Sequence, residues 1–332
     1  MKQLDFLAVG DTVVDDFIKL KDASVHCKLD TEACELCMRF GDKVPFESST
    51  VIYGVGNAAN AAVSAARLGL ATGFISNTGD DDRGKKILEA FQSEGIDTEA
   101  VTLHKEVPTN YHYVLWYDSE RTILVHQNEY PYRFPKHLPP PKTLYFSSIN
   151  EKAVEYRDHV IEYLEQHPSI FFAFQPGVFE IKSGAKAFSH FYKRANFVIC
   201  NKEEAARILG HGSTEMVELL KGLRALGPEE VVITDGRNGA FAMNESGAWS
   251  IPMYPDPREP FERTGAGDAF ASTVAVALTL GKPLEEALLW GPVNSMSVVQ
   301  DIGGQRGLLS REKIEALLAK APETYRIEKM KF

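Results

Sequence analysis

Residues 263–270 read RTGAGDAF and lead directly into the small-residue stretch ASTVAVA at 271–277. Gly265 and Gly267 allow the backbone to turn with its amides pointing outward, and the start of the following helix adds partial positive charge. These features predict an anion hole for a phosphoryl group. Asp268 lies beside it, where a carboxylate can accept the proton of an attacking hydroxyl. An ordinary glycine turn followed by an acid that favours the helix start explains the same letters about equally well.

Short apolar runs recur along the chain and predict buried strands at residues 4–10, 71–76, 143–147, 170–174, 197–200 and 231–234. Most are separated by helix-like stretches, such as 84–93 and 151–165, and the chain is helical in pattern after residue 266. Strands that alternate with helices indicate a parallel sheet with crossover helices on both faces.

Two regions, about 12–53 and 109–128, interrupt this alternation. The second contains YHYVLWY at 111–117 and RTILV at 121–125, which predict a hairpin. We expect both regions to form a small β-sheet lid over a ligand cleft, attached to one domain that spans residues 1–332. The alternative is a dimer interface, because an exposed apolar hairpin has to be covered.

The composition is that of an ordinary globular protein, with 332 residues of which 44% are hydrophobic and 25% charged. The net charge of −10 argues against a nucleic-acid partner, which would require clustered Lys and Arg. No segment approaches the ~20 apolar residues that span a bilayer, and the start lacks a signal-peptide pattern. We therefore expect a cytoplasmic protein without a membrane partner.

The four cysteines are Cys27, Cys34, Cys37 and Cys200. Cys27, Cys34 and Cys37 lie close to His26, and thiolates and an imidazole at this spacing are able to converge on zinc. A second Cys-x-x-Cys pair is absent from the sequence. We favour reduced structural thiols over a metal site.

Residues 264–270 resemble the C-terminal signature of the ribokinase (PfkB) carbohydrate-kinase family, and GVGNAAN at 54–60 resembles its N-terminal loop. The resemblance implies a ribokinase-like three-layer α/β/α fold with a mainly parallel central sheet and a small β-sheet lid. It also implies an ATP-dependent kinase in which Asp268 is the catalytic base and Gly265, Ala266 and Gly267 form the anion hole. The chain departs from the pattern at Val55 and at Glu262-Arg263, where the family usually has Gly and Asp-Thr.

On the substrate side, the resemblance assigns Gly56, Asn57 and Asn60 to sugar binding. Gly56 allows close approach of the backbone, and Asn60 is able to donate and accept hydrogen bonds. Asp15 follows the first predicted strand, where a carboxylate can bridge two vicinal hydroxyls at the carboxyl edge of the sheet. Asp11 and Asp16 are neighbouring alternatives, and Asp15 keeps the family spacing.

On the nucleotide side, Asn201 and Glu204 resemble the family's Asn-x-x-Glu motif, which implies Mg2+ bound by Glu204 mainly through water. A helix N-cap with acids in its first turn explains these letters about equally well. The other implied ATP-binding residues are Thr234, Gly236, Gly239 and Asn294. The loop at 301–304 offers carbonyls to a monovalent cation such as K+.

Two other functions compete with a kinase. Gly54 and Gly56 also match the Gly-x-Gly-x-x-Ala fingerprint of nicotinamide-dependent oxidoreductases, with acids at 80–82 for a ribose contact. That fingerprint normally opens the first βαβ unit, whereas a strand at 4–10 already precedes it. A binding protein without activity is suggested by Val55 and Arg263, but the retained Asp268 counts against it.

The expected substrate is a sugar, a sugar acid or a nucleoside with a primary hydroxyl. The lid offers an arginine that suits a carboxylate and aromatic rings that suit a nucleobase, and an alternating strand does not reveal which face meets the cleft. The lid candidates are Tyr111, His112, Tyr113, Trp116, Arg121 and Gln127. We also expect a homodimer that forms through the lid.

Overall fold

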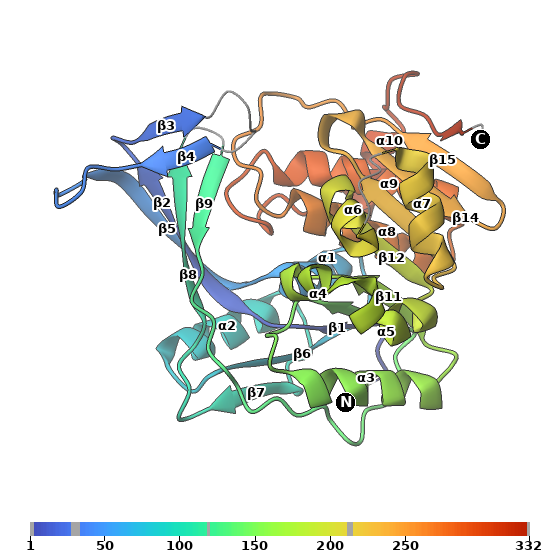
Figure 1. Cartoon of the computed structure of the whole chain (residues 1–332), viewed down its shortest axis with the longest axis horizontal. Coiled ribbons are helices and arrows are strands. Elements are labelled where there is room, and N and C mark those ends of the chain that lie inside the picture. Colours follow the sequence, from blue (N-terminus) through green and yellow to red (C-terminus); the bar gives the residue numbers. More distant parts are fainter. Residues whose placement is uncertain (1–2, 28–33, 118–119, 211–214, 331–332) are drawn as a thin grey trace.

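The computed structural model describes residues 3–27, 34–117, 120–210 and 215–330. Within these residues the strands form a ten-stranded sheet, a four-stranded sheet and a two-stranded ribbon (Figure 1). The large sheet contains, in spatial order, β16 (Glu328–Lys329), β15 (Gly247–Ile251), β14 (Ala240–Asn244), β13 (Glu230–Thr234), β12 (Phe197–Asn201), β11 (Phe171–Gln175), β10 (Thr143–Ser147), β1 (Phe6–Val9), β6 (Thr72–Gly79) and β7 (Val101–His104).

Neighbouring strands from β7 to β13 run parallel, and β14 to β16 extend the sheet in antiparallel fashion. The apolar runs form strands because both faces of the sheet are buried. In β1, Phe6 and Ala8 belong to one hydrophobic core, whereas Leu7 and Val9 belong to the other. All the strands predicted from apolar runs lie in this sheet.

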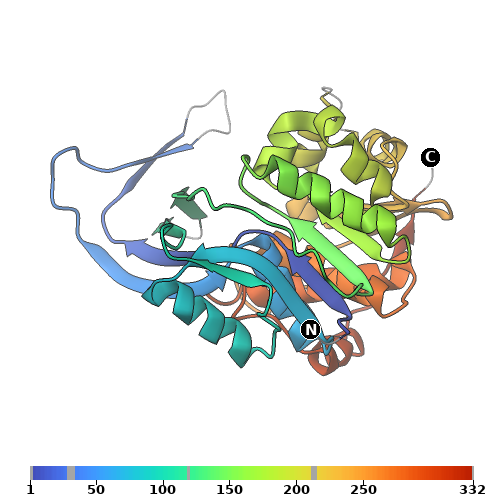
Figure 2. The same ribbon diagram turned by 90° about the horizontal axis from the view of Figure 1, so that it is seen from below.

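Helices cover both faces of the large sheet (Figure 2). The first core is covered by α1 (Asn57–Arg67), α2 (Asp82–Ser93), α8 (Ala266–Thr279), α9 (Leu284–Val298) and α10 (Arg311–Leu318). The second core is covered by α3 (Val154–Gln166), α4 (Val178–Ala187), α5 (Ser189–Arg194), α6 (Lys202–Leu209) and α7 (Met216–Ala225). A 3-10 turn, η1 (Gly236–Asn238), follows β13. The predicted α/β fold with a mainly parallel sheet and a small second sheet is confirmed.

The small sheet has the order β5 (Phe46–Val55), β2 (Val13–Leu20), β8 (Tyr111–Tyr117) and β9 (Glu120–Leu124). It stands at one side of the body, on the left in Figure 1. On its inner face, Phe17, Val114 and Trp116 pack against Ile302 of the body. Because directly opposed residues share a face, the paired residues Asp15 and His112 also lie on this inner side.

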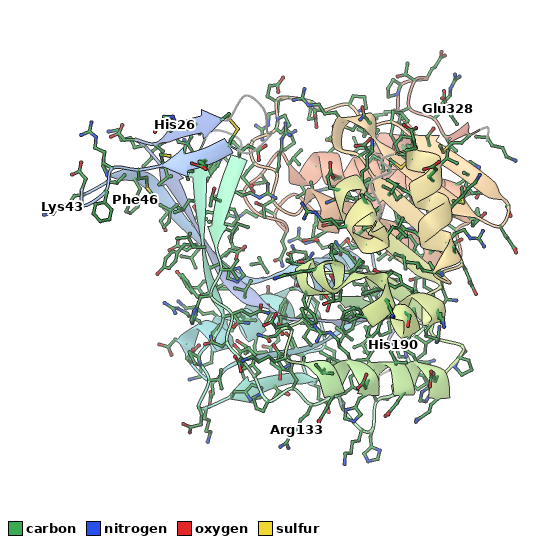
Figure 3. All side chains as sticks on the ribbon, viewed as in Figure 1. His26, Lys43, Phe46, Arg133, His190 and Glu328 are labelled. Atoms are coloured by element: carbon green, nitrogen blue, oxygen red, sulfur yellow. A yellow bond between two sulfur atoms is a disulfide. The ribbon has the colours of Figure 1, made fainter. Side chains whose placement is uncertain are left out.

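An arm, of which residues 21–27 and 34–45 are described, projects from the small sheet (Figure 2). It contains the ribbon of β3 (Ser24–Cys27) and β4 (Cys34–Cys37), and the side chains of His26 and Lys43 stand out from it in Figure 3. The expectation of reduced thiols is wrong for two cysteines: the antiparallel register sets Cys27 opposite Cys34, their Cα atoms lie 4.1 Å apart, and they form a disulfide. Cys37 and Cys200 are free thiols.

The arm gives no support to the zinc alternative. In the described ranges, no group of three or more His, Cys, Asp or Glu side chains is arranged to hold a metal ion.

The helices of those same ranges are also all too short or too polar to cross a bilayer.

Candidate active site

The start of α8 depends on a glycine at position 265. Gly265 has a φ of 78°, in the left-handed region that side chains disfavour. A Cβ atom there would lie only 2.2 Å from the Cα atom of Gly304. At Gly267, by contrast, an added Cβ would have no atom within 4 Å. The two predicted glycines therefore differ: one allows two backbones to touch, and the other borders open space.

The backbone amides of this turn differ in their partners, and of the three residues predicted to form the anion hole, Ala266 has its amide bonded within the protein. Ala266 donates its N–H to the carbonyl of Arg263 at 3.4 Å, and Ala269 donates to the carbonyl of Gly265 at 2.8 Å. In the part of the chain that the structure describes, the amides of Gly267 and Asp268 have no protein acceptor. Two N–H groups at a helix start are thus left to bind an anion.

Asp268 lies in the first turn of α8, and its two carboxylate oxygens have separate donors. Asn60 donates its Nδ2–H to Oδ2 at 2.8 Å, and Gln175 donates its Nε2–H to Oδ1 at 3.1 Å. Burial raises the pKa of Asp268, while both hydrogen bonds and the charge of Arg121 lower it. The net increase in pKa makes this carboxylate a stronger proton acceptor than an exposed one.

Gln175 was missed by sequence reasoning. It is the last residue of β11 and accepts a hydrogen bond from the Tyr145 hydroxyl at 2.5 Å. Tyr145 is buried, which raises the pKa of its phenol, so the hydroxyl stays a donor. This contact fixes the Gln175 amide with its N–H toward Asp268. A polar residue at the carboxyl end of a parallel strand was the available signal.

Asn60 belongs to α1, and its side chain joins the two sequence signatures. Besides the bond to Asp268, its Oδ1 accepts a hydrogen bond from Gln305 Nε2 at 3.0 Å. Gln305 also donates to the carbonyl of Gly54 at 2.7 Å. Gly56 precedes the helix with a φ of 119°, and a Cβ there would lie 3.0 Å from the carbonyl oxygen of Asp11. Asn57 is the first residue of the same helix.

Asp15 is 8% exposed on the inner face of the small sheet. Its Oδ1 has no hydrogen-bond partner among the described residues and lies 3.4 Å from Nδ1 of His112. Asp16 points to the outer face, where it accepts hydrogen bonds from Ser49 and Tyr111. Of the two, only Asp15 has a carboxylate oxygen that receives no hydrogen bond from the described residues.

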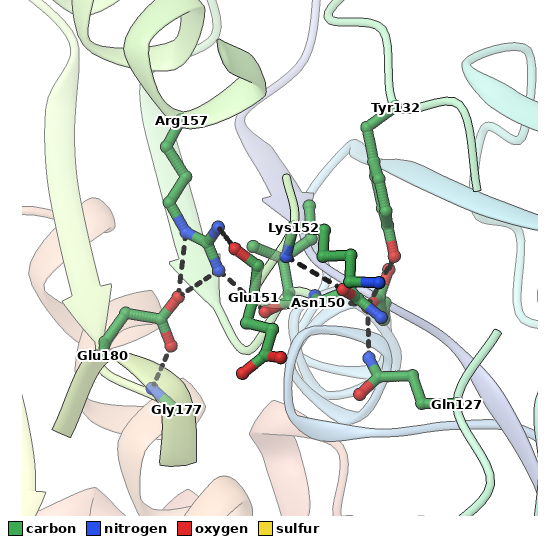
Figure 4. Close-up of polar contacts among 10 residues, drawn as sticks. Gln127, Tyr132, Asn150, Glu151, Lys152, Arg157, Gly177 and Glu180 are labelled. Atoms are coloured by element: carbon green, nitrogen blue, oxygen red, sulfur yellow. Dashed lines mark hydrogen bonds and ion pairs between the residues drawn. The ribbon is translucent and has the colours of Figure 1, made fainter. Parts of the chain in front are cut away.

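Asp11 instead binds protein groups. Its carboxylate accepts hydrogen bonds from Gln127 Nε2 at 2.6 Å, from the Tyr132 hydroxyl and from the backbone N–H of Asn150 at 2.8 Å. Figure 4 shows Gln127, Tyr132 and Asn150 converging on this point. Burial raises the pKa of Asp11 to about 6, although these hydrogen bonds lower it in part.

A cavity of about 490 Å³ borders the start of α8. Thr234, Gly236 and Gly239, all predicted to bind ATP, line it together with Ala266 and Gly267. The rest of its wall combines apolar side chains with two cations and two acids, and is formed by Arg237, Met253, Tyr254, Asp256, Glu259, Pro260, Arg263, Phe270, Pro292, Ser295, Met296 and Val299.

Asn294, which was also predicted to bind ATP, is not among the residues that line this cavity. Its side chain is fully buried, donates to Thr273 Oγ1 at 2.7 Å and accepts from the Leu309 amide at 2.9 Å. It therefore ties α9 to α8 and to the segment before α10. Its neighbour Ser295 lines the cavity instead.

Asn201 and Glu204 form a capping box at the start of α6. Asn201 Oδ1 accepts from the Glu204 amide at 2.8 Å, and Glu204 Oε2 accepts from the Asn201 amide at 2.9 Å. The two residues therefore do form a helix cap, as the alternative explanation of these letters expected. The cap uses only one oxygen of the Glu204 carboxylate. Burial raises the pKa of Glu204, and the negative charge of Asp268 raises it further, so the two carboxylates share one electrostatic environment.

Glu262, one of the residues at which this chain differs from the family signature, is completely buried. Its Oε1 accepts hydrogen bonds from the amide and the hydroxyl of Thr264 at 2.7 and 2.5 Å, and its Oε2 accepts from the Gly303 amide at 3.3 Å. The longer acid therefore fixes the α8 turn and the loop at 301–304 relative to each other.

The structure does not support the oxidoreductase alternative. Gly54 and Val55 end β5, which pairs antiparallel with β2 in the small sheet. A dinucleotide fingerprint requires a parallel βαβ unit around its glycines. The motif is therefore in the wrong structural context.

This chain resembles known carbohydrate kinases over most of its length. The model of the pfkB family of carbohydrate kinases matches residues 18–311. Ribokinase of Bacillus subtilis is 26% identical over 80% of this chain and 87% of its own length. The 5-dehydro-2-deoxygluconokinase of Halalkalibacterium halodurans is 26% identical over 81% of this chain and 86% of its own. Arabidopsis thaliana ribokinase, solved with ribose and ATP, superposes with a TM-score of 0.77 at 18% identity, covering 95% of this chain and 99% of its own.

The family match extends over most of the chain, and the signature residues at 54–60 and 264–270 meet in space at the contact between Asn60 and Asp268. This chain therefore belongs to the pfkB family of carbohydrate kinases.

Proposed function

We propose that this kinase transfers the γ-phosphoryl group of ATP to a primary hydroxyl of a small sugar or sugar-like substrate, with Asp268 as the base. The proposal rests chiefly on one observation: the Asp268 carboxylate lies beside two N–H groups without a protein acceptor, at the helix start. The nucleotide cavity borders this helix start. The relatives are named for a neutral sugar and for a sugar acid, and both classes are candidate substrates.

The transfer follows from the position of these groups. Asp268 accepts the proton of the substrate hydroxyl as its oxygen bonds to the γ-phosphorus. The bond from that phosphorus to the bridging oxygen of ADP breaks, and ADP leaves. The amides of Gly267 and Asp268 stabilise charge on the phosphoryl oxygens. Asn60 and Gln175 hold the carboxylate in place, and Asp15 binds substrate hydroxyls.

Mg2+ fits the acidic environment around Asp268 and Glu204. The pKa of Asp268 and that of Glu204 are both raised, and the second is raised partly by the first. A divalent cation nearby would offset this repulsion, and its water shell would be held by the free oxygen of Glu204. When bound, Mg2+ neutralises charge on the ATP phosphates.

The small sheet acts as the lid in this proposal, and its outer face supports a homodimer. Val51, Tyr113 and Leu124 form a stripe on that face that Asp16 of β2 interrupts between Val51 and Tyr113, and the three are 37%, 44% and 52% exposed. Packing of two such sheets would remove this apolar surface from water. We infer that two copies associate through their lids.

The substitution Asp268→Asn tests the base directly. It keeps the shape of the side chain but removes the proton acceptor, so we expect kcat to fall by ~10²–10⁴ while ATP still binds. A coupled assay of ADP release measures kcat, and circular dichroism checks the fold.

Glu155→Gln is the matched control, because Glu155 is an exposed acid in the first turn of α3. We expect it to behave like the wild type. If Asp268→Asn retains activity within about tenfold of the wild type, the assignment of Asp268 as general base is wrong.

A further inference from the structure

Arg121 belongs to the small sheet, and its positive charge lies near the reaction centre. It is paired with Trp116 in the β8–β9 register, and Trp116 packs inward against the body. Opposed residues share a face, so Arg121 is also on the inner side. Its Nε lies 3.9 Å from Glu262 Oε1, and its charge lowers the pKa of Asp268.

This guanidinium lacks a close anionic partner among the described residues. Its ion contacts are with Glu120 and Glu262, each at 3.9 Å, although its side chain is only 29% exposed. Glu262 already receives three hydrogen bonds from Thr264 and Gly303. A largely buried guanidinium is stable when a carboxylate or phosphate accepts its N–H groups at short distance.

The nucleotide is not the expected source of that anion. Arg263, Ala266 and Gly267 line the proposed nucleotide cavity, whereas Arg121 is not among the residues that line it. Arg121 instead shares the inner face of the small sheet with Asp15, the proposed ligand of substrate hydroxyls. We therefore assign Arg263 to the nucleotide side of Asp268 and Arg121 to the substrate side.

We propose that the sugar substrate is an acid, and that Arg121 binds its carboxylate while Asp15 binds its hydroxyls. This inference rests on the proposed kinase function and narrows it to one class of substrate. A planar guanidinium matches a carboxylate with two parallel N–H to oxygen bonds. With a neutral sugar, the guanidinium of Arg121 would keep only its two 3.9 Å contacts with Glu120 and Glu262.

The test compares acids with neutral sugars. ADP release is measured with 2-keto-3-deoxygluconate and 5-dehydro-2-deoxygluconate, and with ribose and fructose. We expect the acids to be the better substrates of the wild type. Because hydrogen bonds to charged groups contribute about 1.5–3 kcal/mol, Arg121→Gln should lower kcat/KM for the acids ~10–100-fold. Arg121→Gln also removes a charge that lowers the pKa of Asp268, so we expect some loss with neutral sugars too, but a clearly smaller one than with the acids, and we expect Arg121→Lys to keep part of the preference.

Lys19→Gln is the matched control. Lys19 is another cation of the small sheet, but its Nζ is paired with Glu47 at 2.9 Å. This variant should keep the preference for acids. Equal loss with acids and neutral sugars in Arg121→Gln would overturn the proposal and assign Arg121 to the transferred phosphoryl group. A preference for neutral sugars or for sugar phosphates in the wild type would overturn it as well.

Calorimetric titration of the same acids without ATP separates this inference from the kinase function. Tighter binding of the acids to the wild type than to Arg121→Gln would support the carboxylate site, whether or not any acceptor is phosphorylated. Absence of phosphorylation of every acceptor would contradict the proposed kinase function. Equal affinity of the two proteins for the acids overturns the site, whatever the turnover.

Discussion

At the residue scale, the α8 turn depends on the small size of Gly265. Its left-handed φ and the 2.2 Å approach of an added Cβ to Gly304 leave no room for a side chain. We expect Gly265→Ala to lower the free energy of unfolding by at least ~1–2 kcal/mol and to abolish activity, because the turn has to open. Urea unfolding and the ADP assay measure the two effects.

Gly267→Ala is the control for this prediction. Its Cβ would enter open space at the edge of the proposed nucleotide cavity. The variant should unfold like the wild type but show a higher KM for ATP. Equal stability losses in the two variants would show that backbone conformation is not the cause.

Asp11 predicts a pH dependence of stability. Its pKa is about 6 in the folded protein against an ordinary value of 3.8, so folding favours the protonated form. The corresponding stabilisation is full below the unfolded pKa and is lost as the pH rises through about 6. The loss corresponds to ~2 kcal/mol between pH 4 and 7.

Asp11→Asn removes this titration. The difference in unfolding free energy between wild type and variant should therefore change in favour of the variant as the pH rises from 4 to 7. Urea unfolding at several pH values measures it. A difference that stays constant with pH would contradict the raised pKa.

At the scale of elements, a buried ion pair joins α3 to the start of α4. Arg157 donates from Nε and Nη2 to Glu180 Oε1 at 3.1 and 2.8 Å, and Gly177 donates its amide to Glu180 Oε2 (Figure 4). Arg157 also donates to the carbonyl of Ile149 at 2.8 Å. This clamp fixes the chain that follows β10 and β11, next to Asp11 and Gln175.

We expect Glu180→Gln to lower the free energy of unfolding by about 3–5 kcal/mol, because it leaves a buried guanidinium without its counter-charge. Urea unfolding measures the loss. The control is Glu315→Gln, which breaks the exposed pair of Arg311 and Glu315 at 2.9 Å and should cost less than about 1 kcal/mol. Similar losses in both variants would contradict a special role of burial.

At the scale of the whole molecule, the proposed dimer depends on the outer stripe of Val51, Tyr113 and Leu124. We expect sedimentation velocity to show a dimer for the wild type and a monomer for Leu124→Asp, because a buried charge without a partner opposes association. Leu103→Asp is the control, since Leu103 is 38% exposed on β7 of the large sheet. A monomeric wild type, or a dimer that survives Leu124→Asp, would exclude this interface.

The sequence by itself determined the α/β fold, the family and the local chemistry of the α8 turn. Apolar runs specify strands of a doubly covered sheet, and the base and the glycines of residues 263–270 are neighbours in the chain, so short-range rules suffice for them. The cytoplasmic location and the monovalent cation site at 301–304 stay predictions.

Only the tertiary structure decided which distant residues meet at Asp268. Asn60 and Gln175 are separated from Asp268 by 208 and 93 positions, and Gln305 joins them from a loop without a motif. Strand register decided that Asp15 and Arg121 face inward and Asp16 outward, and that Cys27 lies opposite Cys34. Such contacts depend on how strands pair and cross over, which local residue preferences do not encode.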